Sequence, residues 1–455
     1  MKNLLLLFLA ISLFSCQEEV VKPDYVLLSG KVNNNNAKLI NISNSDFKEA
    51  ITIAEDGTFA DTLNITNNGF YSMRIGREGT SIYLTKGAVI NLDVDVKKFD
   101  ESLSYTGDVS AENNYLKKKF LLSEKTMGVP DMYSLKENEF LAEINKLNDN
   151  YTSLLSSTKN ISKEFIAKEK KELEYAHVNN IENFQEYYRY FKKDNDFVVS
   201  KNYYEEIKDF NYSDLEAYNS SNAYKSLLET HYYRLANVNK GQEGHVESLS
   251  YLKLINKNIP DGKEKDEMMT NYLRYGMKAD KNLDDVYAIY KKANPSSKNL
   301  PKITERYDLL KRLTPGNVSP TFNYENHKGG ETSLADLKGK IVYVDVWATW
   351  CGPCKREIPF LKELDKEYHG KNIAFVSISI DEKKDYDAWR SMVTEKELGG
   401  YQLMADNDWK SKFVADYGIR GIPRFLLIDA EGKIINADAP RPSSTGIRTT
   451  INGLL

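Results

Sequence analysis

Apolar and polar residues alternate with a period near two between residues 25 and 96. Short β-rich runs such as YVLLSGKV and GFYSMRI are separated by turn pairs such as Asp56-Gly57. This alternation places one face of each strand in a core, and such pairs join neighbouring strands. The pattern predicts a small antiparallel β domain over residues 24–107, a sandwich or an open barrel. It contains no catalytic constellation, so we interpret it as a spacer or docking module.

The hydrophobic period lengthens to three or four residues after about residue 111, which indicates helices. One such face consists of Phe140, Ile144, Leu147, Tyr151 and Leu154. The pattern predicts a helical domain over residues 110–312. Its many tyrosines fit half-buried helix packing, because the ring is apolar and the hydroxyl is polar. A carbohydrate-binding surface is the alternative.

A third pattern begins after LTPGNVSPTF (313–322), whose prolines and glycine predict a domain boundary. KIVYVDVW and IAFVSISI are nearly continuous apolar strands, typical of strands buried on both faces. Helices are expected over 352–368 and around Trp389, and RFLLIDAEGKII predicts a hairpin. Alternating strands and helices predict an α/β domain over residues 313–455.

The N-terminus has the pattern of an export signal. Lys2 precedes an apolar run from Leu4 to Phe14, which is too short to span a bilayer. The run ends in Leu-Phe-Ser-Cys, which resembles a bacterial lipobox and predicts a signal peptide over 1–15 with a lipid on Cys16. A plain secretory signal is the alternative.

A lipidated Cys16 would anchor the chain to a membrane in the cell envelope, facing an oxidising compartment. No aspartate follows Cys16 directly. In Gram-negative lipoproteins this absence favours the outer membrane on its periplasmic side. Because Glu18 and Glu19 resemble a surface-export signal, a surface location stays open.

The overall charge and the histidines exclude two classes of function. The formal net charge is −4, from 62 basic and 66 acidic residues, so no basic excess argues for nucleic acid. The five histidines do not fall at metal-ligand spacings, so we expect no metal site. They are His177, His231, His245, His327 and His369.

Two of the chain's three cysteines, Cys351 and Cys354, form a Cys-Gly-Pro-Cys pair where a strand meets a helix. A helix N-terminus lowers the pKa of a thiol there, and Cys354 is expected one turn further in and more buried. A disulfide closing so short a loop adds little stability. The pair is therefore predicted to act in thiol–disulfide exchange. Half of a zinc site is the alternative, but no further cysteine and only an isolated His369 lie near enough in sequence to complete it.

The stretches WATWCGPCKREIP and GIPRFLLID resemble the TlpA-like thiol–disulfide oxidoreductases, which have a thioredoxin fold. The resemblance covers residues 313–455 and implies a central mixed sheet flanked by helices. It also implies that DAPRPSSTGIRTTINGLL (438–455) forms a final strand and helix. The β and helical regions resemble the large N-terminal halves of some of these envelope lipoproteins.

The resemblance also implies roles for individual residues. Cys351 attacks a partner disulfide and Cys354 resolves the mixed disulfide. Asp345, six residues before Cys351, matches a buried acid and is expected to accept the proton of Cys354. Glu357 matches a second acid near the dithiol, with a solvated helix glutamate as its alternative. Having both acids departs from many relatives, which carry only one.

Further matches concern the surface around the dithiol. Pro423, after Ile422, matches the cis-proline loop that docks an extended substrate, and a proline at strand entry is independently a credible cis site. Pro359 matches a kink within the helix. The implied substrate-binding residues are Trp350, Gly352, Pro353, Ile422 and Pro423.

These observations predict a membrane-tethered thiol–disulfide oxidoreductase that needs no cofactor beyond its redox-active disulfide. Its partners would be protein thiols and disulfides in the envelope and an upstream electron donor. Gly-Pro between the cysteines favours a reductase. Two alternatives stay open: a surface binding or assembly lipoprotein with an auxiliary redox domain, and a thiol peroxidase. The latter lacks its usual Pro-x-x-x-Thr-x-x-Cys stretch before Cys351.

Overall fold

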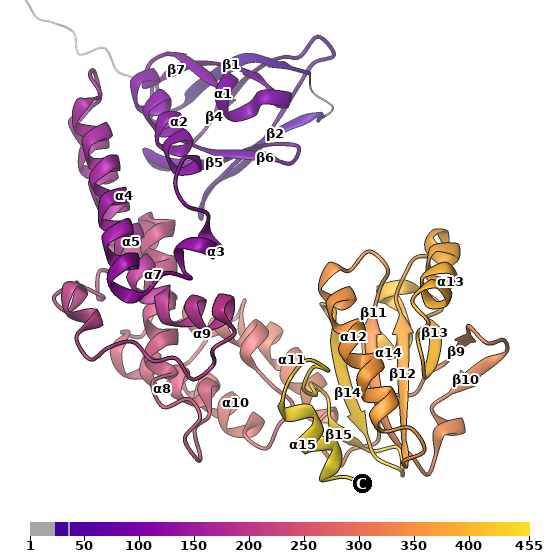
Figure 1. Ribbon diagram of the computed structural model, residues 1–455. Coiled ribbons are helices and arrows are strands. Elements are labelled where there is room, and N and C mark those ends of the chain that lie inside the picture. The colour runs from indigo at the N-terminus through magenta and orange to yellow at the C-terminus, as the bar shows by residue number, and fades with distance from the viewer. Residues whose placement is uncertain (1–22, 35–36) are drawn as a thin grey trace, which may run out of the picture. The chain divides into compact units, whose positions relative to one another are not determined.

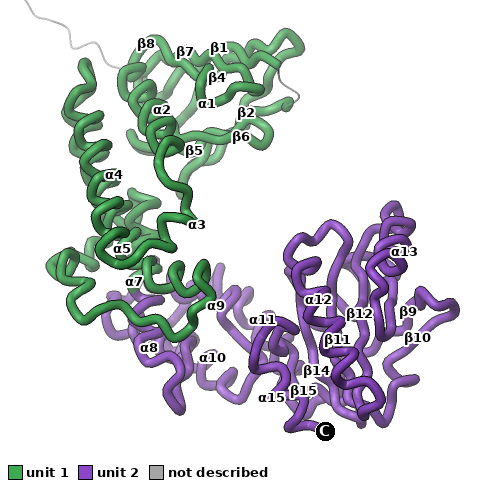
Figure 2. The backbone as a smooth tube through the Cα atoms, viewed as in Figure 1, with its two compact units in different colours: residues 1–231 green, residues 232–455 purple. Residues whose placement is uncertain are grey.

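The computed structural model describes residues 23–34 and 37–455 (Figure 1). The predicted signal peptide and lipidation site at Cys16 lie outside these residues. The chain divides into two compact units, residues 1–231 and 232–455, so the division falls inside the predicted helical domain 110–312 (Figure 2). In the described part of the chain, no helix is both long and apolar enough to cross a membrane.

The first unit begins with two four-stranded sheets packed around one apolar core. One sheet has the order β4–β1–β7–β8 and contains β1 (Val26–Asn33), β4 (Thr58–Leu63), β7 (Val89–Asp95) and β8 (Ser104–Gly107). The other has the order β3–β2–β5–β6 and contains β2 (Leu39–Ser43), β3 (Lys48–Thr52), β5 (Gly69–Ile75) and β6 (Glu78–Leu84). The result is a sandwich, but β1 and β7 pair in parallel. The expected all-antiparallel arrangement was wrong there, because side-chain alternation is the same for both strand directions.

Helices continue the first unit. They are α1 (Phe99–Ser102), α2 (Ser110–Glu124), α3 (Val129–Met132), α4 (Glu137–Ser157), α5 (Lys163–Lys192), α6 (Leu215–Ser220) and α7 (Asn222–Ala236), the last of which runs past the division at residue 231. Three rings join this region to the sandwich: Phe165 of α5 meets Tyr83 of β6 and Tyr115 of α2 edge-on, at 4.9 and 5.6 Å between centroids. Many tyrosines here are buried, as packing residues would be, including Tyr133, Tyr175, Tyr203 and Tyr224.

The second unit begins with α8 (Glu247–Asn258), α9 (Lys263–Gly276), α10 (Leu283–Lys292) and α11 (Leu300–Arg312). A seven-stranded sheet of order β10–β9–β13–β12–β11–β14–β15 follows. Its strands are β9 (Asn323–Asn326), β10 (Glu331–Ser333), β11 (Ile341–Trp347), β12 (Ile373–Ser379), β13 (Tyr401–Met404), β14 (Arg424–Ile428) and β15 (Ile434–Asn436). Its helices are α12 (Gly352–Glu367), α13 (Tyr386–Glu395), α14 (Lys412–Asp416) and α15 (Gly446–Asn452).

Two apolar clusters cover the faces of this sheet. Alternate residues of β11, Ile341 and Tyr343, pack with side chains of α12 and α15. Val342, Val344 and Val346 pack on the other face with α13 and α14. Because β12 and β13 run parallel to β11 while β14 runs antiparallel to it, the sheet is mixed. The predicted fold class, a thioredoxin-type α/β domain after β and helical regions, is confirmed.

Short 3₁₀ helices complete the described secondary structure: η1 (Val96–Lys98), η2 (Tyr203–Ile207), η3 (Ala335–Leu337), η4 (Lys383–Asp385) and η5 (Asp408–Lys410). Residues 438–455 form α15 and no strand, so the expected final strand was wrong. Pro440 and Pro442 offer no N–H group to a sheet. Ser443 donates its N–H to Glu357 instead.

Candidate active site

The cysteine pair lies at the junction of β11 and α12. Cys351 is the N-cap residue of α12, and its Sγ accepts a hydrogen bond from the N–H of Cys354 at 3.1 Å. The two cysteines are joined by a disulfide, with their Cα atoms 5.3 Å apart. Each residue is 4% exposed. The sequence-based expectation that Cys354 would be the more buried of the two was therefore wrong. The N-terminal end of α12 presents unpaired N–H groups to this sulfur, which favours a thiolate on Cys351.

A buried hydrogen-bond network fixes the loop that leads to Cys351. The carboxylate of Asp381 accepts the Thr349 N–H at 3.0 and 3.1 Å and the Thr349 hydroxyl at 2.7 Å. The Ser379 hydroxyl donates to the same carboxylate at 2.6 Å. Asp381 is 1% exposed, so these donors supply the hydrogen bonds that a buried carboxylate requires. Sequence reasoning missed this residue, although an acid directly after the apolar run IAFVSISI was a signal for it.

Asp345 occupies the face of β11 that packs against α12. It is buried, as the sequence predicted, and the Ser377 hydroxyl is its hydrogen-bond donor. Burial, and next the negative charge of Glu357, raise the pKa of Asp345 to about 8, against a smaller lowering by the Ser377 hydrogen bond. A carboxyl with this pKa exchanges its proton near neutral pH, as a general acid–base needs. The structure thus brings the two predicted acids into one electrostatic site.

Glu357 is buried in α12 and is not the solvated helix residue of the alternative reading. Its carboxylate accepts the Ser443 N–H at 3.0 Å and the Ser443 hydroxyl at 2.9 Å. The guanidinium of Arg441 lies 3.9 Å from it. These partners satisfy the buried carboxylate of Glu357, which lies close enough to Asp345 to raise the pKa of that residue. Ser443 and Arg441 were not predicted, because nothing in the sequence brings their segment back to α12.

A cavity of about 20 Å³ adjoins Asp345. Its lining includes Ser377, Gln402 and, toward the outer end, Lys362 and Asp365. Within the described residues, two buried polar atoms around it have no protein partner: Gln402 Oε1 and Trp347 Nε1. The volume is sufficient for one water molecule, for which these atoms offer an acceptor and a donor. The cavity therefore leaves room for one water molecule next to Asp345.

The Ile422–Pro423 peptide bond is cis, as the sequence predicted. Val346 of β11 pairs with Arg424 of β14 in antiparallel register. Pro423 directly precedes Arg424, and the Cys351 loop follows β11, so both extend from the same edge of the sheet. Ile422 and Pro423 are half-buried there. An extended peptide lying across this edge would meet both the dithiol and the cis-proline backbone.

The remaining predicted surface residues also surround the dithiol. Trp350 is 53% exposed, and its ring lies 6.4 Å from that of Trp409, a second exposed tryptophan that sequence reasoning missed. Gly352 and Pro353 form the first turn of α12, half-buried and exposed respectively. Pro359 lies inside α12, where it removes one backbone donor. Among the described residues, no group of three or more His, Cys, Asp or Glu side chains is placed to hold a metal ion.

A dithiol at a helix N-terminus, a buried acid behind it and a cis-proline at the same sheet edge define a thioredoxin-fold dithiol protein. The Redoxin family model matches residues 314–451. The thiol-disulfide oxidoreductase ResA of Bacillus thuringiensis strain Al Hakam is 31% identical over 124 residues, which are 27% of this chain and 69% of that protein. The chain belongs to the thiol-disulfide oxidoreductases of the thioredoxin fold.

Solved structures from Bacteroides vulgatus also resemble the C-terminal region. One, provisionally described as a thiol-disulfide oxidoreductase, is 51% identical and covers 30% of this chain and 90% of its own, with a TM-score of 0.28. A second solved structure, the thioredoxin domain of a thiol-disulfide oxidoreductase, is 28% identical. It covers 31% of this chain and 97% of its own, with a TM-score of 0.29.

Proposed function

We propose that this chain is a membrane-tethered, TlpA-like thiol–disulfide oxidoreductase that uses Cys351 and Cys354 to reduce disulfides of partner proteins in the cell envelope. The observation that carries the proposal is the placement of both cysteines at the α12 N-terminus, at the same sheet edge as the cis-proline. Within the chain, the redox-active disulfide is the only cofactor proposed.

The proposed reaction begins with the reduced pair. The Cys351 thiolate attacks one sulfur of the partner disulfide, whose S–S bond breaks and releases the other sulfur as a thiolate, which takes a proton from the solvent. Asp345 then takes the proton of Cys354, and the new thiolate attacks the Cys351 sulfur of the mixed disulfide. The partner leaves with two thiols, having gained two electrons and two protons, and the chain holds the Cys351–Cys354 disulfide. An external thiol or dithiol donor returns it to the reduced state.

The direction of transfer and the location are parts of the same proposal. Gly-Pro between the cysteines is the dipeptide of thioredoxin, whose potential is about −270 mV, against about −120 mV for a strong oxidant. A reductase in an oxidising compartment requires an upstream electron donor. We place the chain at the envelope, anchored through a lipid on Cys16 to the outer membrane and facing the periplasm.

Trapping of partners tests the function. In a C354S variant the resolving thiol is absent, so Cys351 is expected to stay joined to partner proteins as mixed disulfides that dithiothreitol releases. A C351S variant should trap far fewer partners, and the double variant none. Equal trapping by the single variants would contradict the assigned order of attack. Peroxide consumption by the wild-type chain, absent from C351S, would favour a peroxidase instead.

The anchor is tested separately. Replacing Cys16 by Ser should move the chain from the membrane fraction to the soluble fraction, without changing the reactivity of the purified dithiol. An unchanged membrane fraction would contradict lipidation at this residue.

A further inference from the structure

The last helix before the thioredoxin domain is held firmly against that domain. Leu309 and Leu310 of α11 pack on the apolar core of the sheet, and Leu313 lies within it. Residues 314–319 then pair with the hairpin of β14 and β15: Gly316 donates to the Ile434 carbonyl at 2.8 Å, and Ser319 donates to that of Gly432 at 2.9 Å. The predicted boundary segment 313–322 is therefore tightly hydrogen-bonded, and α11 shares a fixed frame with the site.

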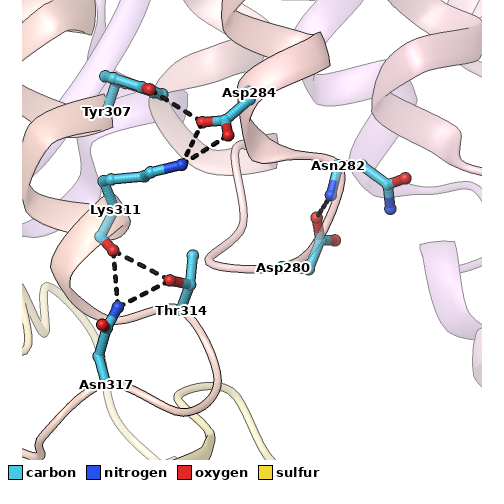
Figure 3. Close-up of polar contacts among 7 residues, drawn as sticks. All are labelled: Asp280, Asn282, Asp284, Tyr307, Lys311, Thr314 and Asn317. Carbon is cyan, nitrogen blue, oxygen red and sulfur yellow. Dashed lines mark hydrogen bonds and ion pairs between the residues drawn. The ribbon is translucent and has the colours of Figure 1, made fainter.

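Polar contacts also join α11 to its neighbours (Figure 3). The Lys311 ammonium bridges to the Asp284 carboxylate of α10, which also accepts the Tyr307 hydroxyl at 2.9 Å. At the end of α11, the Lys311 carbonyl accepts bonds from Asn317 and Thr314, each at 3.0 Å. The bridge is exposed and contributes little by itself, but it adds to the apolar contacts that orient α11.

This arrangement brings three guanidiniums together beside the cis-proline. Leu309 contacts the backbone at Gly418, because a Cβ built on Gly418 would lie 2.4 Å from Leu309 Cδ2. Arg306 lies one turn earlier on α11 and so shares the face of Leu309. Burial lowers the pKa of Arg306, and the positive charges of Arg420 and Arg424, which interact with it electrostatically, lower it further, to about 10 in all.

The cluster has fewer carboxylates than cations. Arg424 pairs with Asp438. Among the described residues, no carboxylate pairs with Arg306 or with the exposed Arg420. Arg306 donates through Nη2 to the Met277 carbonyl at 3.1 Å, while its buried Nε–H has no protein partner there. Guanidinium donors prefer carboxylates, which they bind in a forked geometry.

We propose that Arg306, Arg420 and Arg424 form a docking site for an acidic peptide segment next to the cysteine of a partner protein. The inference rests on the proposed function and adds a substrate class to it. A peptide that enters along Pro423 passes Arg420 and Arg424 within three residues of that proline. The helical region thus contributes Arg306 directly to substrate selection.

The test uses the purified, pre-reduced full chain and three fluorescent, self-quenched peptide dimers. Each dimer is joined by one disulfide, and its cysteine is flanked by Glu, Gln or Lys. The second-order rate constant of reduction is read from the gain in fluorescence. We expect the Glu dimer to react at least about tenfold faster than the Lys dimer at low salt, with the ratio falling toward one in 0.5 M salt.

Substitutions assign the effect to the cluster. R420Q removes an exposed guanidinium and should lower the Glu-to-Lys ratio severalfold, and R306Q should lower it similarly. R448Q is the matched control, because Arg448 bonds to Glu367 at the far end of α12, about 24 Å along the helix from Cys351. Equal rates for the three dimers, or an equal loss of ratio in R448Q, would overturn the proposal.

A binding measurement separates this proposal from the proposed function. The Glu peptide with Ser in place of Cys cannot react, so its fluorescence anisotropy reports docking alone. Binding that weakens in R420Q but not in R448Q would support the docking site even if no dimer were reduced. If the Gln dimer is reduced but the Ser peptide does not bind and the Glu dimer reacts no faster, the proposed oxidoreductase function stands. The proposed docking site is then rejected.

Discussion

At the scale of single residues, Asp345 determines how the site responds to pH. In an unfolded chain an aspartate has a pKa of about 3.9, whereas burial beside Glu357 raises the pKa of folded Asp345 to about 8. Between these values the folded chain binds one more proton than the unfolded chain. Stability from this group is therefore fully present below about pH 4 and is lost as the pH rises to about 8.

The variant D345N is expected to remove this dependence. Between pH 5 and pH 8 the wild-type free energy of unfolding should fall by roughly 3 kcal/mol more than that of D345N. Urea unfolding, monitored by tryptophan fluorescence, measures this difference in unfolding free energy, because all four tryptophans lie in the thioredoxin domain. D365N, an acid at the outer part of the same cavity, is the control and should keep the wild-type slope.

Glu357 offers a second test at this scale. Since its charge raises the pKa of Asp345, E357Q should move the midpoint of the reduction rate against pH to lower pH, by about one unit or less. Gln retains an oxygen that can accept from Ser443. E363Q, an exposed acid on the same helix, should leave the midpoint in place. A midpoint that disappears in E357Q but persists in D345N would make Glu357 the proton acceptor.

At the scale of elements, the β11–α12 junction depends on a contact from another strand end. D381A would leave the Thr349 N–H and hydroxyl and the Ser379 hydroxyl without their buried acceptor. We expect a loss of about 3 kcal/mol in unfolding free energy and slower disulfide exchange, because the loop before Cys351 loses its anchor. Urea unfolding and stopped-flow reduction measure the two effects.

The control for D381A is D336A. Asp336 also accepts bonds from a serine, Ser333, but it is exposed, so its loss should lower the free energy of unfolding far less than the loss of Asp381. Similar losses of unfolding free energy in D381A and D336A would mean that the burial of Asp381 does not determine how much its hydrogen bonds stabilise the fold.

The sequence predicted elements with strong patterns. The apolar runs gave β11 and β12, and the helix after Gly352 ends within one residue of the expected position. The short strands β9, β10 and β13 were missed, since three or four residues carry too little periodicity. Cys351, Asp345 and Pro423 were identifiable from motif spacing. Asp381 and Ser443 act on the site through tertiary contacts, and the role proposed for Arg306 depends on its tertiary position; local patterns encode neither.

At the scale of the whole molecule, the joint between α11 and the thioredoxin domain determines whether the helical region can take part in selection. In G418A, a methyl group would meet Leu309 at 2.4 Å, at a backbone φ of +58°. G432A has a similar left-handed backbone (φ +84°) but no neighbour within 4 Å, so it isolates the backbone strain. We expect about 1 kcal/mol of destabilisation for G432A and about 1–3 kcal/mol more for G418A.

The double variant G418A/L309A completes this test. Removing the Leu309 side chain should relieve the clash. In tryptophan-monitored unfolding, adding G418A to L309A should therefore lower the free energy of unfolding only as much as G432A lowers it in the wild type. An unchanged cost would mean that α11 does not contact the Gly418 loop in solution, and the placement of Arg306 beside the cis-proline would fail with it.

The central claim is that Cys351 and Cys354 form a reversible redox pair, and the redox equilibrium of that pair tests it most directly. The oxidised fraction is measured by thiol alkylation across a series of dithiothreitol ratios at pH 7. We predict a two-electron transition near the thioredoxin value of about −270 mV, which both single Cys→Ser variants abolish. A potential near −120 mV would contradict the reductase assignment. A pair that cannot be cycled at all would contradict the oxidoreductase account of this site.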